Sequence, residues 1–198
     1  MKEIFQLQWD LNTYTLANIG KDYGETITDP EQKPVWIESY RKALSAELAE
    51  LIREVEEYGP GTRNAKIEIV DMLHFLVSLS HIAGIATSQI PEAFRGEGSF
   101  SSIAIRTFLA LDDLQNALKW KWWAKGGGYK EDKAREAVLE LWKCFWELCG
   151  LADMNQETVK KIYVAKNEVN FKRQDRHYNE DTKTEADNLA LGNVIDGR

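Results

Sequence analysis

The chain has few cysteines and no long apolar segment, and each absence excludes a class of protein. Cys144 and Cys149 are the only two cysteines, and their spacing of five residues fits neither a zinc knuckle nor a disulfide framework. We expect reduced thiols in the core of a cytoplasmic protein. No segment reaches the roughly 20 apolar residues of a membrane span, and the opening MKEIFQLQWDL lacks the apolar core of a signal peptide.

Positive charge is also scarce. The 25 Lys and Arg residues against 32 Asp and Glu residues give a net charge of −7. Nonspecific nucleic-acid binding needs a basic surface, so this balance argues against it, while leaving room for a local basic pocket. A content of 43% hydrophobic residues suffices for one sizeable core. We expect a single domain over residues 1–178 and a polar tail over 179–198, either disordered or ordering over a ligand.

Strand signals are absent, and nearly every patterned segment has helical periodicity. Breaks that contain glycine or proline separate these segments. The pattern predicts an all-α protein built as a helical bundle. Helices are predicted over residues 3–18, 34–57, 63–84, 100–122, 131–150 and 155–175.

A faint internal similarity relates residues 46–85 to residues 110–151. Its alignment places Ala134 and Ala137 opposite Glu68 and Asp71. A duplicated helix pair with one set of carboxylates erased explains this pattern, and chance similarity between amphipathic helices explains it equally well.

What the chain does contain is two pairs of carboxylates at helical spacing. Glu47 and Glu50 lie in SAELAEL, and Glu68 and Asp71 lie in KIEIVDMLHF. The i, i+3 spacing puts both members of each pair on one helix face, one turn apart. Four carboxylates directed at one point would repel one another unless cations lay between them. Mg²⁺ prefers such oxygen ligands and can hold a polyphosphate at the same time.

The second pair carries most of this argument because its helix is apolar on every side. Isoleucine, valine, leucine, methionine and phenylalanine dominate residues 67–82, which is the pattern of a buried helix. Burying ionised carboxylates costs several kcal/mol each unless they are paired or bind a metal. No Lys or Arg follows Lys66 in this helix, so a metal explains the buried pair better than local ion pairing. The first pair taken alone also fits a solvated acidic face.

A basic segment near the C-terminus offers candidate phosphate ligands. Lys166, Asn170 and Arg173 share one helix face, with Asn167 beside them. Long donors grouped in this way can hold phosphate oxygens, and an ordinary solvated basic face has the same spacing.

The N-terminal helix carries two amides that could read a base. Gln8 and Asn12 are four residues apart in LQWDLN and share a helix face. Amides have both donors and acceptors, so they can contact the edge of a pyrimidine, although two amides on a helix surface are usually only solvated.

Taken together, these motifs resemble the dimeric, all-α dUTPases, which are relatives of the MazG-like nucleoside-triphosphate pyrophosphohydrolases. The matching segments occur in the family's order: LQWDLN, AELAEL, NAKIEIVDMLHFLVS, YVAKNEVNFKRQD and ADN. The E-x-x-E and E-x-x-D frame marks the wider superfamily. The KN-x-x-N-x-x-R block and the LQ-x-x-LN segment narrow the resemblance to the dUTPase branch.

The resemblance implies hydrolysis of dUTP to dUMP and pyrophosphate by a homodimer, with dUDP accepted as well. It implies two or three Mg²⁺ ions per site, for which Mn²⁺ can substitute. By matching positions, it assigns metal binding and catalysis to Glu47, Glu50, Glu68 and Asp71, uracil contacts to Gln8 and Asn12, and sugar and phosphate contacts to Lys166, Asn167, Asn170, Arg173, Asp187 and Asn188.

The chain departs from the family pattern outside the metal ligands. REVEEYGPG follows the first couplet where the family has a segment rich in Trp and Lys, and KWKWWAK (Lys119–Lys125) occurs in the second half instead. Its rings could stack a base or its lysines could hold phosphate, but packing in the core or at an interface is favoured. HYN and ADN stand where the family has GYK and EDN. The second half also has more aromatic bulk than one small bundle readily buries, which favours a dimer: Trp120, Trp122, Trp123, Trp142, Phe145 and Trp146.

Three other interpretations are left open. The same scaffold could act on dCTP or another dNTP. Asp71-x-x-His74 suggests a di-iron carboxylate bundle, but neither His81 nor His177 supplies the second such motif that this site requires. Finally, the acids could be only the charged face of a helical binding or regulatory module without catalysis.

Overall fold

A computed structural model describes residues 1–93, 96, 98–121, 123–175 and 191. These residues form seven α-helices, a short 3₁₀ turn and no strand, which confirms the predicted all-α class. In chain order the elements are α1 (Lys2–Ala17), α2 (Tyr23–Thr28), α3 (Gln32–Tyr58), α4 (Arg63–Ile82), η1 (Thr87–Gln89), α5 (Phe100–Asn116), α6 (Glu131–Leu151) and α7 (Gln156–Asp175).

The six predicted helices are present, but two details differ from expectation. The periodicity missed α2, which is too short to show a repeat; it begins where the Asp22 carboxylate accepts a hydrogen bond from the main-chain nitrogen of Glu25 (2.8 Å). The helix predicted to reach residue 122 ends at Asn116. The main-chain nitrogen of Lys130 donates to the Ala117 carbonyl (2.8 Å), which occupies the acceptor that a continuing helix would use.

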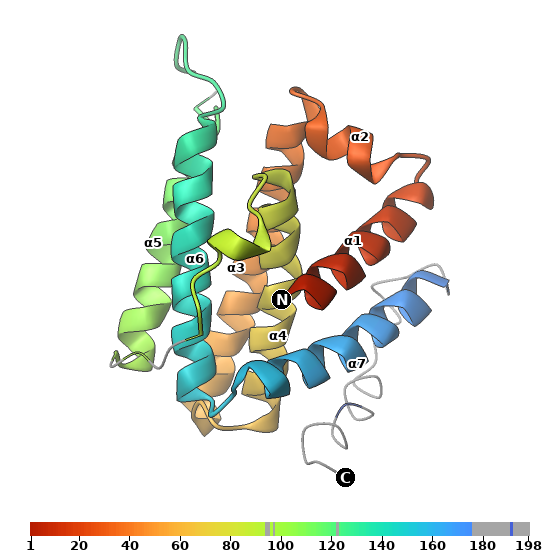
Figure 1. Cartoon of the computed structure of the whole chain (residues 1–198). Coiled ribbons are helices and arrows are strands. Elements are labelled where there is room, and N and C mark those ends of the chain that lie inside the picture. Colours follow the sequence, from red (N-terminus) through yellow and green to blue (C-terminus); the bar gives the residue numbers. More distant parts are fainter. Residues whose placement is uncertain (94–95, 97, 122, 176–190, 192–198) are drawn as a thin grey trace.

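Two helix hairpins and one helix pair make up the architecture (Figure 1). The hairpins α3–α4 and α5–α6 lie side by side, with α3 against α5 and α4 against α6. Helices α1 and α7 run next to each other and both contact α4. Helix α4 therefore has neighbours on several sides, which explains why its sequence is apolar all round.

The aromatic side chains of α6 fill the core of the monomer itself. Trp142, Phe145 and Trp146 are almost fully buried, and the Trp142 indole donates to Ser80 Oγ (2.9 Å). These three residues therefore do not supply the surplus apolar bulk that the sequence analysis took as an argument for a dimer. Cys144 and Cys149 are buried and unpaired, as expected, and burial raises the pKa of both thiols.

In the second hairpin, α6 has no acidic pair at the positions that align with Glu68 and Asp71 of α4. Ala134 and Ala137 are buried in α6 at the positions aligned with Glu68 and Asp71. The duplication of the hairpin stays a prediction.

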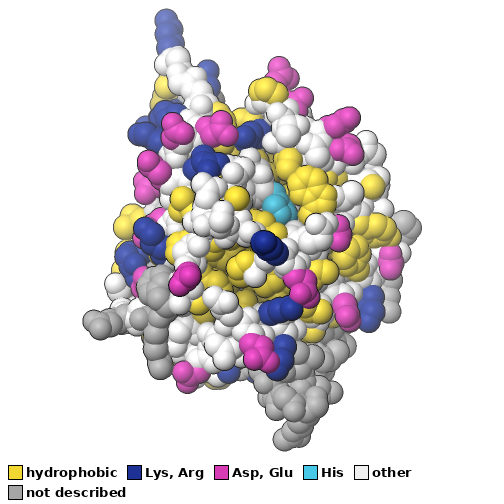
Figure 2. Space-filling model, viewed as in Figure 1, with side chains coloured by type: hydrophobic (Ala, Val, Ile, Leu, Met, Phe, Trp, Pro, Cys, Tyr) yellow, Lys and Arg dark blue, Asp and Glu magenta, His cyan; other side chains and the backbone are white. Residues whose placement is uncertain are grey.

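The face of the molecule shown in Figure 2 carries charged side chains of both signs, with apolar side chains scattered among them. In the part of the chain that the structure describes, no helix is both long and apolar enough to cross a membrane.

Val77 and Val35 provide a matched test of the core. Val77 on α4 is 0% exposed and Val35 on α3 is 57% exposed. We expect Val77→Ala to lower the free energy of unfolding by about 2 kcal/mol, because it removes two buried methyl groups and leaves a cavity. Val35→Ala should change it by less than about 0.5 kcal/mol. Urea unfolding followed by circular dichroism measures both, and equal effects would contradict the placement of α4 at the centre.

Candidate active site

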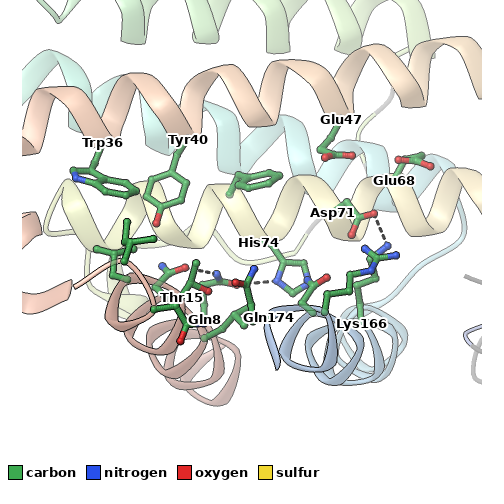
Figure 3. Close-up of a pocket in the computed structure, with 18 of the residues that line it drawn as sticks. Gln8, Thr15, Trp36, Tyr40, Glu47, Glu68, Asp71, His74, Lys166 and Gln174 are labelled. Atoms are coloured by element: carbon green, nitrogen blue, oxygen red, sulfur yellow. Dashed lines mark hydrogen bonds and ion pairs between the residues drawn. The ribbon is translucent and has the colours of Figure 1, made fainter. Parts of the chain in front are cut away.

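A pocket of about 450 Å³ lies between the α3–α4 hairpin and the α1–α7 pair (Figure 3). Helices α1, α3, α4 and α7 all contribute to its wall. Nine of the predicted site residues line it: Gln8, Asn12, Glu47, Glu50, Glu68, Asp71, Lys166, Asn170 and Arg173. Asn167 is buried and donates to the Leu7 carbonyl (3.4 Å), so it joins α7 to α1 and does not line the pocket. Asp187 and Asn188 lie outside the described residues.

Three carboxylates form a compact group at one end of the pocket. One oxygen each from Glu47, Glu50 and Glu68 lies within 4.8 Å of the others. Helix α3 supplies the first two and α4 supplies Glu68, which is only 6% exposed. Clustered carboxylate oxygens are the donor set preferred by hard divalent cations such as Mg²⁺ and Mn²⁺, so these residues fit such an ion.

The electrostatics of Glu68 support the same conclusion. Burial, together with the negative charges of Asp71, Glu47 and Glu50, raises its pKa to about 8, although the positive charge of Lys166 acts in the opposite direction. Near neutral pH this carboxyl group needs either a proton or a nearby cation. A divalent ion bound by the three carboxylates would meet that need.

The negative charge of Asp71 is compensated by a lysine of another helix, whereas the sequence favoured a metal ion. Its Oδ2 lies 2.7 Å from Lys166 Nζ, and both side chains are largely buried. From the sequence, pairing was expected only within α4 and Lys166 was predicted to bind phosphate, so this ion pair between helices was not predicted. Burial of Asp71 therefore no longer argues for a metal on its own, and the metal inference depends mainly on the other three acids.

The two predicted amides are buried, and they are not solvated on a helix surface. Gln8 Nε2 donates to Asn12 Oδ1 (2.8 Å), and Asn12 Nδ2 lies within hydrogen-bond distance of Tyr23 and Ser78. Gln8 Oε1 in turn contacts His74 Nδ1 (2.8 Å). Buried polar groups held this firmly make a recognition surface of defined geometry.

Sequence reasoning missed an aromatic wall at the other end of the pocket. The ring centroids of Trp36 and Tyr40 are 5.9 Å apart, and those of Tyr40 and Phe75 are 6.3 Å apart. Figure 3 shows Trp36 and Tyr40 at one end and Glu47 and Glu68 at the other. The signal was available, because Trp36 and Tyr40 precede Glu47 at spacings that put all three on one face of α3.

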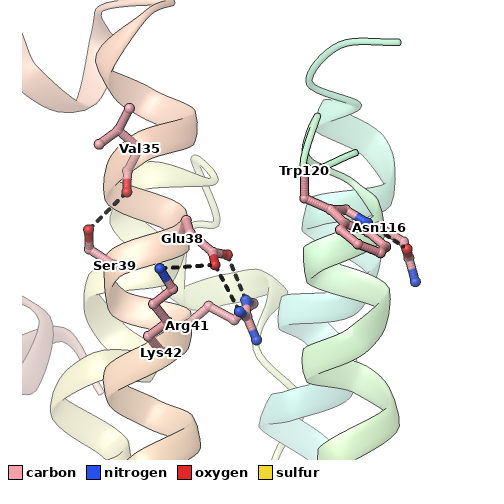
Figure 4. Close-up of polar contacts among 7 residues, drawn as sticks. All are labelled: Val35, Glu38, Ser39, Arg41, Lys42, Asn116 and Trp120. Atoms are coloured by element: carbon pink, nitrogen blue, oxygen red, sulfur yellow. Dashed lines mark hydrogen bonds and ion pairs between the residues drawn. The ribbon is translucent and has the colours of Figure 1, made fainter. Parts of the chain in front are cut away.

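The KWKWWAK segment takes no part in this pocket in so far as it is described. Trp120 and Trp123 contact each other (ring centroids 5.7 Å apart), and the Trp120 indole donates to Asn116 at the end of α5 (Figure 4). They are 38% and 61% exposed, so neither ring belongs to the core. Trp122 lies outside the described residues. Packing at an interface stays a prediction for this segment.

A family model described as dUTPase matches residues 1–178, which include every residue that lines the pocket. The chain belongs to the dUTPase family. No curated protein and no solved structure matches it. The absence of strands among the described residues agrees with the all-α branch of the dUTPases. As a dUTPase the chain hydrolyses dUTP, so it is not a binding or regulatory module without catalysis.

The high pKa of Glu68 predicts a specific pH dependence of stability for the metal-free dUTPase. The pKa of about 8 in the folded state exceeds the ordinary 4.5, so the folded state binds this proton more tightly than the unfolded chain. The stability that Glu68 contributes at low pH is therefore lost as the pH rises from about 4.5 to about 8. We expect Glu68→Gln to flatten the decline, measured by urea unfolding in chelator at several pH values.

The exposed Glu56, also on α3, supplies the control for this experiment. Glu56→Gln should leave the pH dependence unchanged. An equally steep decline in Glu68→Gln would show that the buried carboxyl group is not its source.

Proposed function

We propose that this pocket hydrolyses dUTP to dUMP and pyrophosphate with two or three Mg²⁺ ions held by Glu47, Glu50 and Glu68, and with Asp71 as a further ligand. Mn²⁺ would substitute for Mg²⁺, and dUDP would be a second substrate. The observation that carries the proposal is the group of three carboxylate oxygens within 4.8 Å of one another, in the same pocket as buried amides and cationic side chains.

The charged residues divide the chemistry between them. Bound divalent ions would neutralise phosphate oxygens and lower the pKa of a coordinated water. Glu50, the most exposed acid of the group, or Glu47 orients the attacking water and accepts its proton. Lys166 and Arg173 stabilise the charge on the departing phosphates.

The ion pair between Lys166 and Asp71 has a direct role in this scheme. The ammonium that contacts Asp71 lies in the lining of the pocket, so it can pass from the carboxylate to a phosphate oxygen when substrate arrives. Asp71 is then released to bind a metal. Asn170, one turn beyond Lys166 on α7, adds a neutral donor for the sugar or the phosphates.

The nucleoside half of the pocket suits a pyrimidine. The amides of Gln8 and Asn12 supply hydrogen bonds for the base edge, and the wall of Trp36, Tyr40 and Phe75 supplies apolar contact. Amides serve both uracil and cytosine, so dCTP is the second candidate substrate. The two buried thiols agree with a cytoplasmic location.

A comparison of nucleotides and variants tests the proposal. Incubation with Mg²⁺ and each common dNTP, followed by chromatography, should give dUMP and pyrophosphate from dUTP at the highest rate. Glu68→Ala and Asp71→Asn should lower that rate by on the order of 10³-fold, because charge on the transferring phosphoryl group loses its stabilisation.

Glu56→Gln is again the matched control, since it removes a carboxylate from α3 outside the pocket. Its rate should equal that of the parent. Hydrolysis of dUTP by Glu68→Ala at the parent rate would refute the site assignment.

We also propose a homodimer, formed through the exposed face of α5. Ile105, Phe108 and Leu109 share this face at i, i+3 and i+4 spacing and are 60%, 60% and 54% exposed. Apolar side chains clustered on one helix face commonly mark an interface.

Light scattering tests the dimer directly. The parent should have twice the monomer mass of 22.7 kDa. Phe108→Asp should shift it to the monomer, because the substitution places a charge within the apolar contact. An exposed residue of another helix supplies the control: Val35→Asp should leave the mass unchanged. A dimer that persists in Phe108→Asp would place the interface elsewhere.

A further inference from the structure

Ser78 on α4 has a single hydroxyl proton, and its position is set by the helix. Its Oγ lies 2.9 Å from the main-chain carbonyl of His74, one turn earlier, and the side chain is 0% exposed. A carbonyl oxygen can only accept, so the hydroxyl donates to it. Towards its other neighbours Ser78 Oγ can therefore only accept.

This constraint orients the Asn12 side chain. One end of its carboxamide lies 3.0 Å from Ser78 Oγ and 2.9 Å from the Tyr23 hydroxyl. Because Ser78 Oγ can only accept, this end of the Asn12 carboxamide must be the NH₂ group. Its two protons are donated to Ser78 Oγ and to the Tyr23 hydroxyl oxygen. The opposite end, Oδ1, then faces Gln8 at 2.8 Å.

The orientation of Asn12 fixes that of Gln8 in turn. Gln8 must present Nε2 to Asn12 Oδ1, so its Oε1 faces His74 Nδ1 (2.8 Å) and the Tyr163 hydroxyl (2.6 Å). Both of these groups donate to Oε1. His74 therefore carries its proton on Nδ1.

The protonation state of His74, at the other end of this hydrogen-bond network, independently indicates the same orientation of Gln8. Burial, with a smaller contribution from the charge of Lys166, lowers the pKa of His74 to about 3, so its ring is neutral and has one proton. His74 Nε2 is buried and has no hydrogen-bond partner among the described residues. A proton on Nε2 would be an orphaned buried donor, which is more costly than an unpaired acceptor. The proton thus belongs on Nδ1, where it meets an oxygen of Gln8.

Among the described residues, the contacts of the two amides leave one proton of Gln8 Nε2 and one lone pair of Asn12 Oδ1 unused, and these two are available to a ligand. Both residues line the pocket, so a fixed donor stands beside a fixed acceptor. Uracil accepts at position 4 and donates at position 3, whereas cytosine donates at position 4 and accepts at position 3. In any one pose, the donor of Gln8 and the acceptor of Asn12 are complementary to one base at both positions. The other base then places a donor against the donor and an acceptor against the acceptor.

We propose that Ser78 is a positioning residue for base specificity, because its hydroxyl fixes the direction of the Asn12 and Gln8 carboxamides and thereby decides between uracil and cytosine. The inference rests on the proposed function in one respect, since it takes these amides as the base contacts. Reversing both amides would exchange donor and acceptor and so exchange the preferred base.

Ser80 provides a closely matched control. It lies two residues further along α4, is also 0% exposed, and donates to the Leu76 carbonyl one turn earlier (2.8 Å). It accepts from the Trp142 indole on α6 (2.9 Å) and does not line the pocket. Ser78→Ala and Ser80→Ala therefore remove the same chemical group from the same helix, but only the first touches the amides.

The test is the ratio of kcat/KM for dUTP to kcat/KM for dCTP. In Ser78→Ala this ratio should move towards one by about tenfold, since one orienting buried hydrogen bond is lost. The change should lie mainly in KM, because the phosphate and carboxylate groups are untouched. Ser80→Ala should keep the parent ratio, and Ser78→Thr should restore it, because threonine keeps the hydroxyl and its bond to the preceding turn. A parent-like ratio in a folded Ser78→Ala variant overturns the proposal.

A measurement on the unmodified protein separates this inference from the proposed function. The ¹⁵N resonances of His74 in the ligand-free protein report which ring nitrogen holds the proton. Protonated Nδ1 supports the direction of the network even if no nucleotide is hydrolysed, an outcome that would refute only the proposed function. Protonated Nε2 overturns the inference, whatever the activity and whether or not Ser78→Ala folds.

Discussion

The carboxyl group of Glu68 is buried beside Glu47 and Glu50, and this concentration of negative charge governs the pocket. Apolar side chains surround α4 on several sides, so water has little access to the Glu68 carboxylate. The fold tolerates the arrangement because α7 brings Lys166 to the neighbouring Asp71 and lowers the local charge. A scaffold arranged in this way is ready for a divalent ion, and its metal-free state is under electrostatic strain.

Different helices around the three carboxylates supply the different functional groups of the dUTPase pocket. Helices α3 and α4 contribute the acids, α1 contributes the amides, and α7 contributes the cations, all of which line one pocket. Among the described residues, the hairpin α5–α6 supplies none of those that line the pocket, and the aromatic side chains of α6 fill the core behind α4. Helices far apart in sequence thus converge because the second hairpin holds α4 in the middle of the molecule.

Periodicity and spacing predicted much of this arrangement. The couplets Glu47/Glu50 and Glu68/Asp71 were found because i, i+3 spacing has one geometric meaning on a helix. The Lys166–Asp71 pair was missed because nothing in either segment indicates that α7 crosses α4. Trp142 and Trp123 both belong to the aromatic-rich second half of the sequence, but Trp142 lies on α6 and is buried, whereas Trp123 lies in the turn after α5 and is 61% exposed. The six residues of α2 carry too little repeat to be detected.

The hydrogen bond between Asn12 and Ser78 also joins α1 to α4, and the one between Tyr163 and Gln8 joins α7 to α1. The same contacts thus orient the base-reading groups and hold the helices together. A lineage descended from this protein could not acquire a new base preference by exchanging one amide alone, because the exchange would loosen the bundle. Nucleotide choice and the stability of the helix packing are therefore coupled in this architecture, because the same side chains serve both.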